Sequence, residues 1–266
     1  MITSNVKRAL ASWFLLAAGC QERVGEPPPS ASAIRPSPAV SVTAPATSTA
    51  SAAAPTPVLP VSARTPLPAA PEVASDDPLR GKFTLAQATA GLSGEGELYA
   101  VMRTSAGNLV CELWPDKAPN TVANFVGLAR GLRPYKKGGQ WLKQPLYDGT
   151  EFYSVLRNFS IEGGSPGEKY NDSVGYFIPD ETWQGAKHDQ RGLLCMRAFT
   201  PNKSGSQFMI LDGAATQLDG SFTIFGKCGP ESVLDAISTA PVEAARPKPA
   251  IKLRKLEIVR SKQRPT

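Results

Sequence analysis

The sequence predicts a mainly β domain, a closed barrel or a sandwich of short strands with two helices, and three observations predict it. Short apolar runs alternate with turn residues through the second half of the chain. Two segments, 118–131 and 230–238, place apolar residues at helical spacing. The first part of the chain has a different composition, so we expect the folded domain to span residues 96–262.

The first expected element is a β-hairpin. Residues 98–114, LYAVMRTSAGNLVCELW, are two apolar runs around an Ala-Gly-Asn turn at 106–108. The next segment, APNTVANFVGLARG, predicts a helix that Asn120 or Thr121 caps and a glycine ends. A polar loop rich in glycine and lysine follows at 132–149.

Later apolar runs predict the remaining strands, and a long irregular stretch lies between them at 165–190. The expected strands are EFYSVLRNFSI (151–161), GLLCMRAF (192–199), GSQFMIL (205–211), SFTIFGKC (221–228) and AIKLRKLEIV (250–259). A second helix is expected at PESVLDAIS, where Val233, Leu234 and Ile237 share a face.

The beginning of the chain is typical of an export signal. A basic start is followed by ALASWFLLAAG, an apolar run too short to cross a bilayer core of about 30 Å as a helix. The run ends in LAAGC, which resembles the bacterial lipobox, although Ala17 stands where a leucine is usual. We therefore expect a lipoprotein signal peptide at 1–20 with lipidation at Cys20; a plain signal peptide cleaved nearby is the alternative.

Residues 21–95 are expected to form a disordered linker. The segment is dominated by Pro, Ala, Ser, Thr and Val and has almost no aromatic residues, so it cannot bury enough apolar surface to offset its ordering entropy. A flexible chain of about 55 residues spans roughly 40 Å. These features predict an exported protein, lipid-anchored in the cell envelope and facing the periplasm.

The net charge of +6 does not indicate a nucleic-acid partner once it is located. Residues 246–266 contain eight Lys or Arg and one acidic residue, Glu257, whereas the rest of the chain is nearly neutral. Alternating apolar residues in this segment predict a closing strand with a charged outer face. We expect no nucleic-acid partner and a monomer.

The cysteine and histidine content indicates neither a metal site nor a triad. Cys111, Cys195 and Cys228 form no CxxC motif and allow at most one disulfide within the domain. Because all three lie in or beside apolar runs, we expect reduced core cysteines. The one histidine, His188, lies in the polar irregular stretch, where we expect it to be solvated. No metal and no cofactor are expected.

Four sequence blocks, in this order, resemble the cyclophilins, a family of peptidyl-prolyl cis-trans isomerases. The blocks are WPDKAPNTVANFVGLARG, LYDGTEFYSVLRNFSIEGGSP, PNKSGSQFMIL and LDGSFTIFGK. The resemblance covers about residues 97–260. It implies a closed eight-stranded barrel capped by two helices, and proline-containing polypeptides as substrates.

Such an isomerase needs no covalent step, metal or proton transfer. Rotation about an X–Pro bond faces a barrier near 20 kcal/mol because amide resonance is broken, and the enzyme binds the twisted amide better than the planar forms. The site must supply an apolar socket for the proline ring, groups that hold the peptide backbone, and a cation near the prolyl nitrogen, which becomes basic as it twists.

Carried over residue by residue, the resemblance is partial. Phe159 matches the proline-pocket phenylalanine, Gln207 the glutamine that holds the substrate backbone, and Leu218 a leucine at the groove rim. Met209 stands where a second pocket phenylalanine is usual, as an apolar and adaptable replacement. Phe222 stands for a pocket histidine.

The departures cluster around the expected catalytic strand. Ser154 takes the place of the catalytic arginine, and Glu162 replaces the glutamine that supports that arginine. The usual Met-Ala-Asn-Ala becomes Met-Arg-Ala-Phe at 196–199, so that Arg197 and Phe199 add bulk along the substrate-binding groove.

These departures leave three interpretations open: a weak isomerase, a non-catalytic module that binds proline peptides, and a scaffold domain with a closed groove. A guanidinium from Arg157 or Arg197, oriented by Glu162, would partly restore the missing cation.

Overall fold

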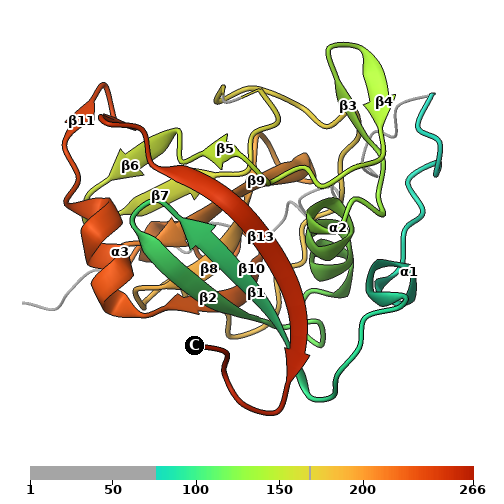
Figure 1. Ribbon diagram of the computed structural model, residues 1–266, viewed down its shortest axis with the longest axis horizontal. Helices are drawn as coiled ribbons and strands as arrows, with labels where there is room; N and C mark the ends of the chain where they lie inside the picture. Colours follow the sequence, from blue (N-terminus) through green and yellow to red (C-terminus); the bar gives the residue numbers. More distant parts are fainter. Residues whose placement is uncertain (1–75, 168) are drawn as a thin grey trace, which may run out of the picture. The chain divides into compact units, whose positions relative to one another are not determined.

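The computed structural model describes residues 76–167 and 169–266 (Figure 1). The expected signal peptide, the lipidation site at Cys20 and the linker up to residue 75 lie outside the described residues. Within the described part, no helix has the length and hydropathy needed to cross a bilayer.

The fold is a curled antiparallel sheet of nine strands in the order β5-β13-β1-β2-β10-β8-β9-β7-β6 (Figure 1). The strands are β1 (Glu97–Thr104), β2 (Gly107–Leu113), β5 (Thr150–Glu151), β6 (Ser154–Leu156), β7 (Ser160–Gly163), β8 (Leu193–Ala198), β9 (Ser204–Leu211), β10 (Ile224–Gly229) and β13 (Lys252–Ser261). Two ribbons accompany it, β3 (Tyr135–Lys137) with β4 (Gln140–Leu142) and β11 (Val242–Glu243) with β12 (Arg246–Pro247).

The two edge strands of this sheet are neighbours in the chain. Only two residues separate β5 from β6, and one of them, Phe152, donates its N–H to the carbonyl of Ile251 beside β13 at 3.0 Å. Counted together, β5 and β6 form one interrupted strand that joins both edges. The prediction of a mainly β, eight-stranded barrel is therefore confirmed, and the structure adds that one of its strands is broken.

Alternation along the strands divides the apolar residues into an inner and an outer set, because successive side chains point to opposite faces. On β9, Phe208 and Ile210 are in the main core, whereas Met209 and Leu211 belong to a second cluster on the other face. On β7, Ile161 points inward, and its neighbours Ser160 and Glu162 point outward. The outer face of β6 to β10 therefore carries the expected site residues.

Two helices pack against the barrel, α2 (Pro119–Ala129) and α3 (Glu231–Ser238), as predicted. The predicted caps of α2 are wrong: Glu181, far along the chain, accepts hydrogen bonds from the backbone N–H groups of Asn120 at 3.0 Å and Thr121 at 2.7 Å. A carboxylate at this end also complements the helix dipole. Gly131 follows the helix at φ +68°, a conformation that favours glycine.

The folded domain begins earlier than residue 96, so the expected linker is too long by about twenty residues. A short helix, α1 (Leu85–Thr89), begins with a capping box in which Thr84 and Gln87 exchange hydrogen bonds. The ring of the preceding Phe83 lies against Gly127 of α2, with no room there for a side chain. Arg130 fastens the other end by donating to the carbonyl of Ala88 at 2.6 Å.

The expectation of three reduced cysteines is wrong for two of them. Cys111 on β2 and Cys228 on β10 are directly opposed across the ladder and form a disulfide. Their separation of 117 residues conceals this proximity, because β2 and β10 become neighbours only when the barrel forms. Cys195 is free and buried, as expected.

Candidate active site

A row of paired residues crosses the outer face of the barrel. Ser154 on β6 is opposite Glu162 on β7, which is opposite Met209 on β9. Met209 is opposite Cys195 on β8, and Cys195 is opposite Ile224 on β10. Paired residues of a ladder share a face, so this row brings the strand of the missing arginine beside the expected proline pocket.

The four expected pocket residues meet in one apolar cluster, which we call the socket: Phe159, Met209, Leu218 and Phe222. Met209 is buried, and the other three are half-buried against the same group of buried strand residues. Leu218 is held at the edge by a turn of 3-10 helix, η1 (Thr216–Leu218). An apolar cluster of this kind offers the contacts that a prolyl ring requires.

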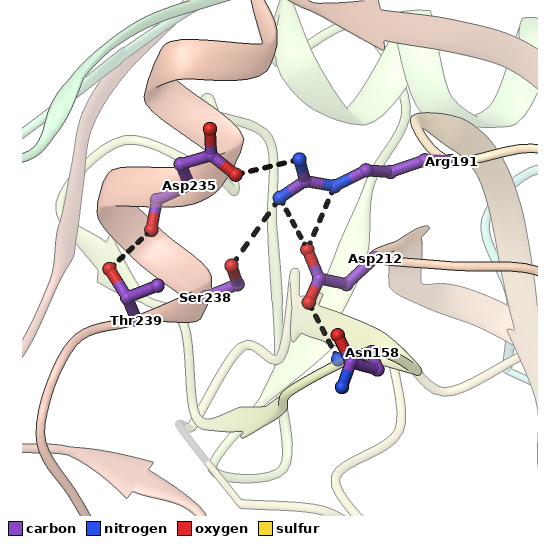
Figure 2. A network of polar contacts seen from close by, with 6 residues as sticks. All are labelled: Asn158, Arg191, Asp212, Asp235, Ser238 and Thr239. Carbon is purple, nitrogen blue, oxygen red and sulfur yellow. Dashed lines mark hydrogen bonds and ion pairs between the residues drawn. The ribbon is translucent and has the colours of Figure 1, made fainter.

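A polar network fixes the turn that carries Phe159 (Figure 2). Asn158 adopts φ +61°, and its N–H donates to Asp212 at 2.7 Å. The guanidinium of Arg191 donates to Asp212 at 2.7 Å and pairs with Asp235 of α3, also at 2.7 Å. The turn is thereby tied to the end of β9 and to helix α3, so that Phe159 has a defined position.

Beside the socket lies a buried cluster of polar side chains. Arg197 donates through Nε to Oε2 of Glu162 at 3.1 Å. The hydroxyl of Tyr153 lies 2.7 Å from Oε1 of Gln207 and 3.3 Å from Oε2 of Glu162. Ser160 completes the set by donating to the other oxygen of Glu162 at 3.3 Å. Burial, then the charge of Glu162, raises the pKa of Tyr153, so this hydroxyl stays protonated and acts as a donor.

Arg197 is the charged group of this cluster that still has hydrogen-bonding capacity. It is 7% exposed, and its guanidinium lies 3.7 Å from the ring centre of Tyr170 and 5.4 Å from that of Phe199. Its buried Nη1 has no acceptor within the described residues. Arg157 is exposed and takes no part. Of the two arginines proposed for relocation, the structure places Arg197 next to Glu162.

The retained Gln207 is more constrained than its place in the motif implies. It is 1% exposed, accepts from Tyr153 and donates through Nε2 to the carbonyl of Asp172 at 2.9 Å. Ser154 is half-buried, and its short side chain makes no hydrogen bond within the described part. The position of the lost arginine is therefore left open rather than refilled.

Two residues that contact the buried polar cluster were not predicted from the sequence. Tyr153 directly precedes Ser154. The feature that could have identified it is an aromatic hydroxyl on the expected catalytic strand. Tyr170 comes from the irregular stretch, where no periodicity indicates which residue returns to the site. Its side chain is 62% exposed, yet its ring covers Arg197.

The expectation that His188 is solvated is wrong. It is fully buried, and both its N–H and its Nδ1 contact Asp219, at 2.7 and 3.0 Å. This pair anchors the segment beyond Leu218 to the irregular stretch. Within the described residues, no group of His, Cys, Asp and Glu is arranged to hold a metal ion.

The comparison with known families shows to which family the chain belongs. Residues 99–258 match the family model described as cyclophilin type peptidyl-prolyl cis-trans isomerase/CLD. The chain belongs to the cyclophilin-type peptidyl-prolyl cis-trans isomerases. This cyclophilin domain is 36% identical over 158 residues to peptidyl-prolyl cis-trans isomerase B of Streptomyces anulatus, covering 58% of this chain and 90% of the relative.

Other relatives and solved structures agree. Peptidyl-prolyl cis-trans isomerase A of Mycobacterium tuberculosis is 38% identical over 149 residues, covering 54% of this chain and 78% of that protein. A Cryptosporidium parvum cyclophilin superposes with a TM-score of 0.54 at 26% identity, covering 62% of this chain and 99% of its own. A second structure of that protein, in the presence of the dipeptide Ala-Pro, gives 0.52 at 27% identity over the same shares.

Proposed function

We propose that this cyclophilin isomerises X–Pro bonds with Arg197 in place of the missing catalytic arginine. The observation that carries the proposal is the position of a buried guanidinium with an unused N–H group next to a socket formed by Phe159 and Met209. Glu162 orients this guanidinium, as a glutamine orients the arginine in the family pattern. The free Nη1 is the donor for the prolyl nitrogen.

The activity is expected to be weak. The guanidinium is held by an ionic partner and covered by Tyr170, so it has less freedom to follow the twisting amide than a dedicated donor. Removing one preorganised donor costs about 10²–10³ in rate. Gln207 contributes by holding Tyr153 and the segment near Asp172 rather than by a free amide.

The clients we propose are proline-containing polypeptides of the cell envelope, approached by a monomer tethered through Cys20. The support is the signal-like start, the LAAGC sequence and the Pro/Ala-rich segment that precedes the domain. Metabolic labelling with palmitate tests the anchor: label is incorporated into the native protein and lost in Cys20→Ser.

The catalytic proposal is tested by cis-trans exchange of a tetrapeptide with one X–Pro bond, followed by NMR exchange spectroscopy. We expect exchange above background with the native protein and a further gain in Ser154→Arg. Arg197→Ala combined with Glu162→Gln, which avoids leaving a buried carboxylate unpaired, is expected to lose at least tenfold. Arg157→Ala, the matched exposed control, keeps the native rate.

The alternative is a module that binds proline peptides without turnover, favoured by the loss of the arginine at Ser154. In that case the peptide binds in titrations, and cis-trans exchange stays at background with the native protein. Ser154→Arg then raises exchange above background. An unchanged rate in the Arg197 variant excludes the relocated guanidinium, and absence of both binding and exchange indicates a closed groove.

A further inference from the structure

A hollow lies on the same side of the barrel as the socket. Two pockets of about 650 and 230 Å³ share Trp114 and Trp183 in their walls. Both tryptophans are half-buried, so their rings are partly available to a ligand. We call the two together the tryptophan pocket. Neither ring has a part in the isomerisation described above.

The larger of the two hollows is suited to a cation. Three carboxylates line it, Glu97, Glu112 and Asp116, against one ammonium, Lys117. Glu112 accepts from the indole N–H of Trp114 at 3.1 Å through one oxygen, which leaves the other available. Tryptophan is the aromatic side chain that binds cations best, and nearby carboxylates add to the attraction.

The protein already shows this mode of binding with its own side chain. The ammonium of Lys117 lies 5.7 Å from the ring centre of Trp183 and 3.5 Å from a carboxylate oxygen of Asp116. The Lys117 side chain is 49% exposed, so a better-placed cation can displace it into solvent. The neighbouring Lys227, opposite Glu112 in the ladder, is turned away to Gln190 at 2.8 Å.

The tryptophan pocket and the socket are built on one apolar cluster. Leu193 and Ile224 line its smaller part and belong to the apolar cluster that contains Phe159 and Met209. Trp114 packs against the same cluster. The buried side chains that link the two sites are therefore apolar.

The register of the sheet sets the distance between the sites. Met209, Cys195 and Ile224 are partners on three adjacent strands, and the backbone N–H of Trp114 bonds the carbonyl of Phe225, beside Ile224, at 2.8 Å. Three steps at about 4.8 Å per strand give roughly 14 Å. An extended chain covers that distance in about four or five residues.

We propose that the tryptophan pocket is a second substrate subsite that binds a lysine or arginine side chain four or five residues away from the isomerised proline. The inference rests on the proposed function, because the proline must occupy the socket for the spacing to apply. It adds a substrate class: proline segments that carry a basic residue at this distance.

The test uses the full chain and a set of matched peptides, each with one proline. Lysine is placed five residues before or five residues after the proline, and the comparison peptides carry glutamine there or lysine next to the proline. Titration followed by tryptophan fluorescence gives Kd, and exchange spectroscopy gives the rate. We expect lysine at one of the two distant positions to tighten binding about five- to tenfold.

The gain in affinity from distant lysine is expected to disappear in Glu112→Gln combined with Asp116→Asn. The glutamine peptide is expected to bind the native and variant proteins equally. Glutamine at 112 still accepts from Trp114, so the pocket keeps its shape. The comparison peptide with lysine next to the proline carries the same total charge, so a gain in affinity that appears only with distant lysine is local.

Each other outcome overturns the inference. If the glutamine peptide is bound and isomerised but distant lysine adds nothing, the subsite is excluded and the proposed function stands. If the gain persists in the double variant, the lysine binds elsewhere. If no peptide is bound or isomerised, the proposed function fails and the subsite with it.

Discussion

At the scale of single residues, the site keeps part of the family pattern and holds a buried guanidinium, that of Arg197, on β8. Phe159, Met209 and Gln207 were proposed from short sequence blocks, and each lies on β9 or directly before β7. The pairing of Arg197 with Glu162 was proposed from the sequence, and Arg157 was named as a further candidate. Only the alternation of faces on β8 decides between them, since it points Arg197 at the outer surface and leaves Arg157 in an exposed turn.

Asp212 is expected to be the residue on which the position of Phe159 depends. Its side chain is 2% exposed and holds both Asn158 and Arg191, so Asp212→Ala leaves the N–H of Asn158 and a half-buried guanidinium without their partner. We expect a loss of roughly 2–4 kcal/mol in the free energy of unfolding, measured by urea denaturation. The control is Asp235→Ala, which removes the 61% exposed partner of the same arginine. It should cost less than about 1 kcal/mol, and equal losses would contradict this account.

Asp219 provides a prediction on pH. Hydrogen bonds from the backbone N–H and the side chain of His188 hold the pKa of this carboxyl below its usual range, with Lys187 contributing less. Because the folded pKa lies below the unfolded value, the stabilisation is present above about pH 4 and is lost as the pH falls through the folded pKa. Urea midpoints between pH 2.5 and 6 should fall less steeply in Asp219→Asn than in the native protein. Parallel profiles would exclude the contribution of Asp219.

At the scale of elements, what the sequence predicts depends on how local the determinant is. The β1–β2 hairpin and the body of α2 are encoded by adjacent residues, and both were predicted. The cap of α2 comes from Glu181, which no local pattern reveals. Helix α1 has a local signal, the Thr84–Gln87 capping box, but the helix is only five residues long and sits beside a Pro/Ala-rich segment.

Helix α1 and the segment before it are expected to stabilise α2 by packing against it. Phe83→Ala removes a ring that is 9% exposed and packed on Gly127, and we expect a loss of about 2–4 kcal/mol in the free energy of unfolding. Amide hydrogen exchange should increase in α1 and in the first turn that follows it, and remain native in β7–β9. Thr84→Ala, which removes only the cap, is expected to cost about 1 kcal/mol. Uniform acceleration across the barrel would show that Phe83 serves the whole core instead.

At the scale of the whole molecule, closure of the barrel places residues that are distant in the chain side by side. The disulfide is the clearest example: Cys111 and Cys228 are separated by 117 residues and are partners across one ladder. Composition alone could not choose among three apolar cysteines, because all three are buried. The exported location predicted from the sequence suits a disulfide, but the sequence alone did not identify which two residues pair.

The disulfide is expected to stabilise the barrel without contributing to the site. It closes a loop of more than one hundred residues, and constraining the unfolded chain in this way contributes typically about 2–4 kcal/mol. Cys111→Ala combined with Cys228→Ala should lower the urea midpoint by the corresponding amount and leave KM for a proline peptide native at low temperature, because Phe159 lies in the turn before β7 and Met209 lies on β9, away from the bridged strands β2 and β10. Reducing agent should shift the native protein toward the variant and leave the variant unmoved. Cys195→Ala, which removes the remaining thiol of the domain, is the contrasting case and should raise KM, since it changes the packing beside Met209. A native midpoint in the double variant would show that the ladder alone joins β2 to β10.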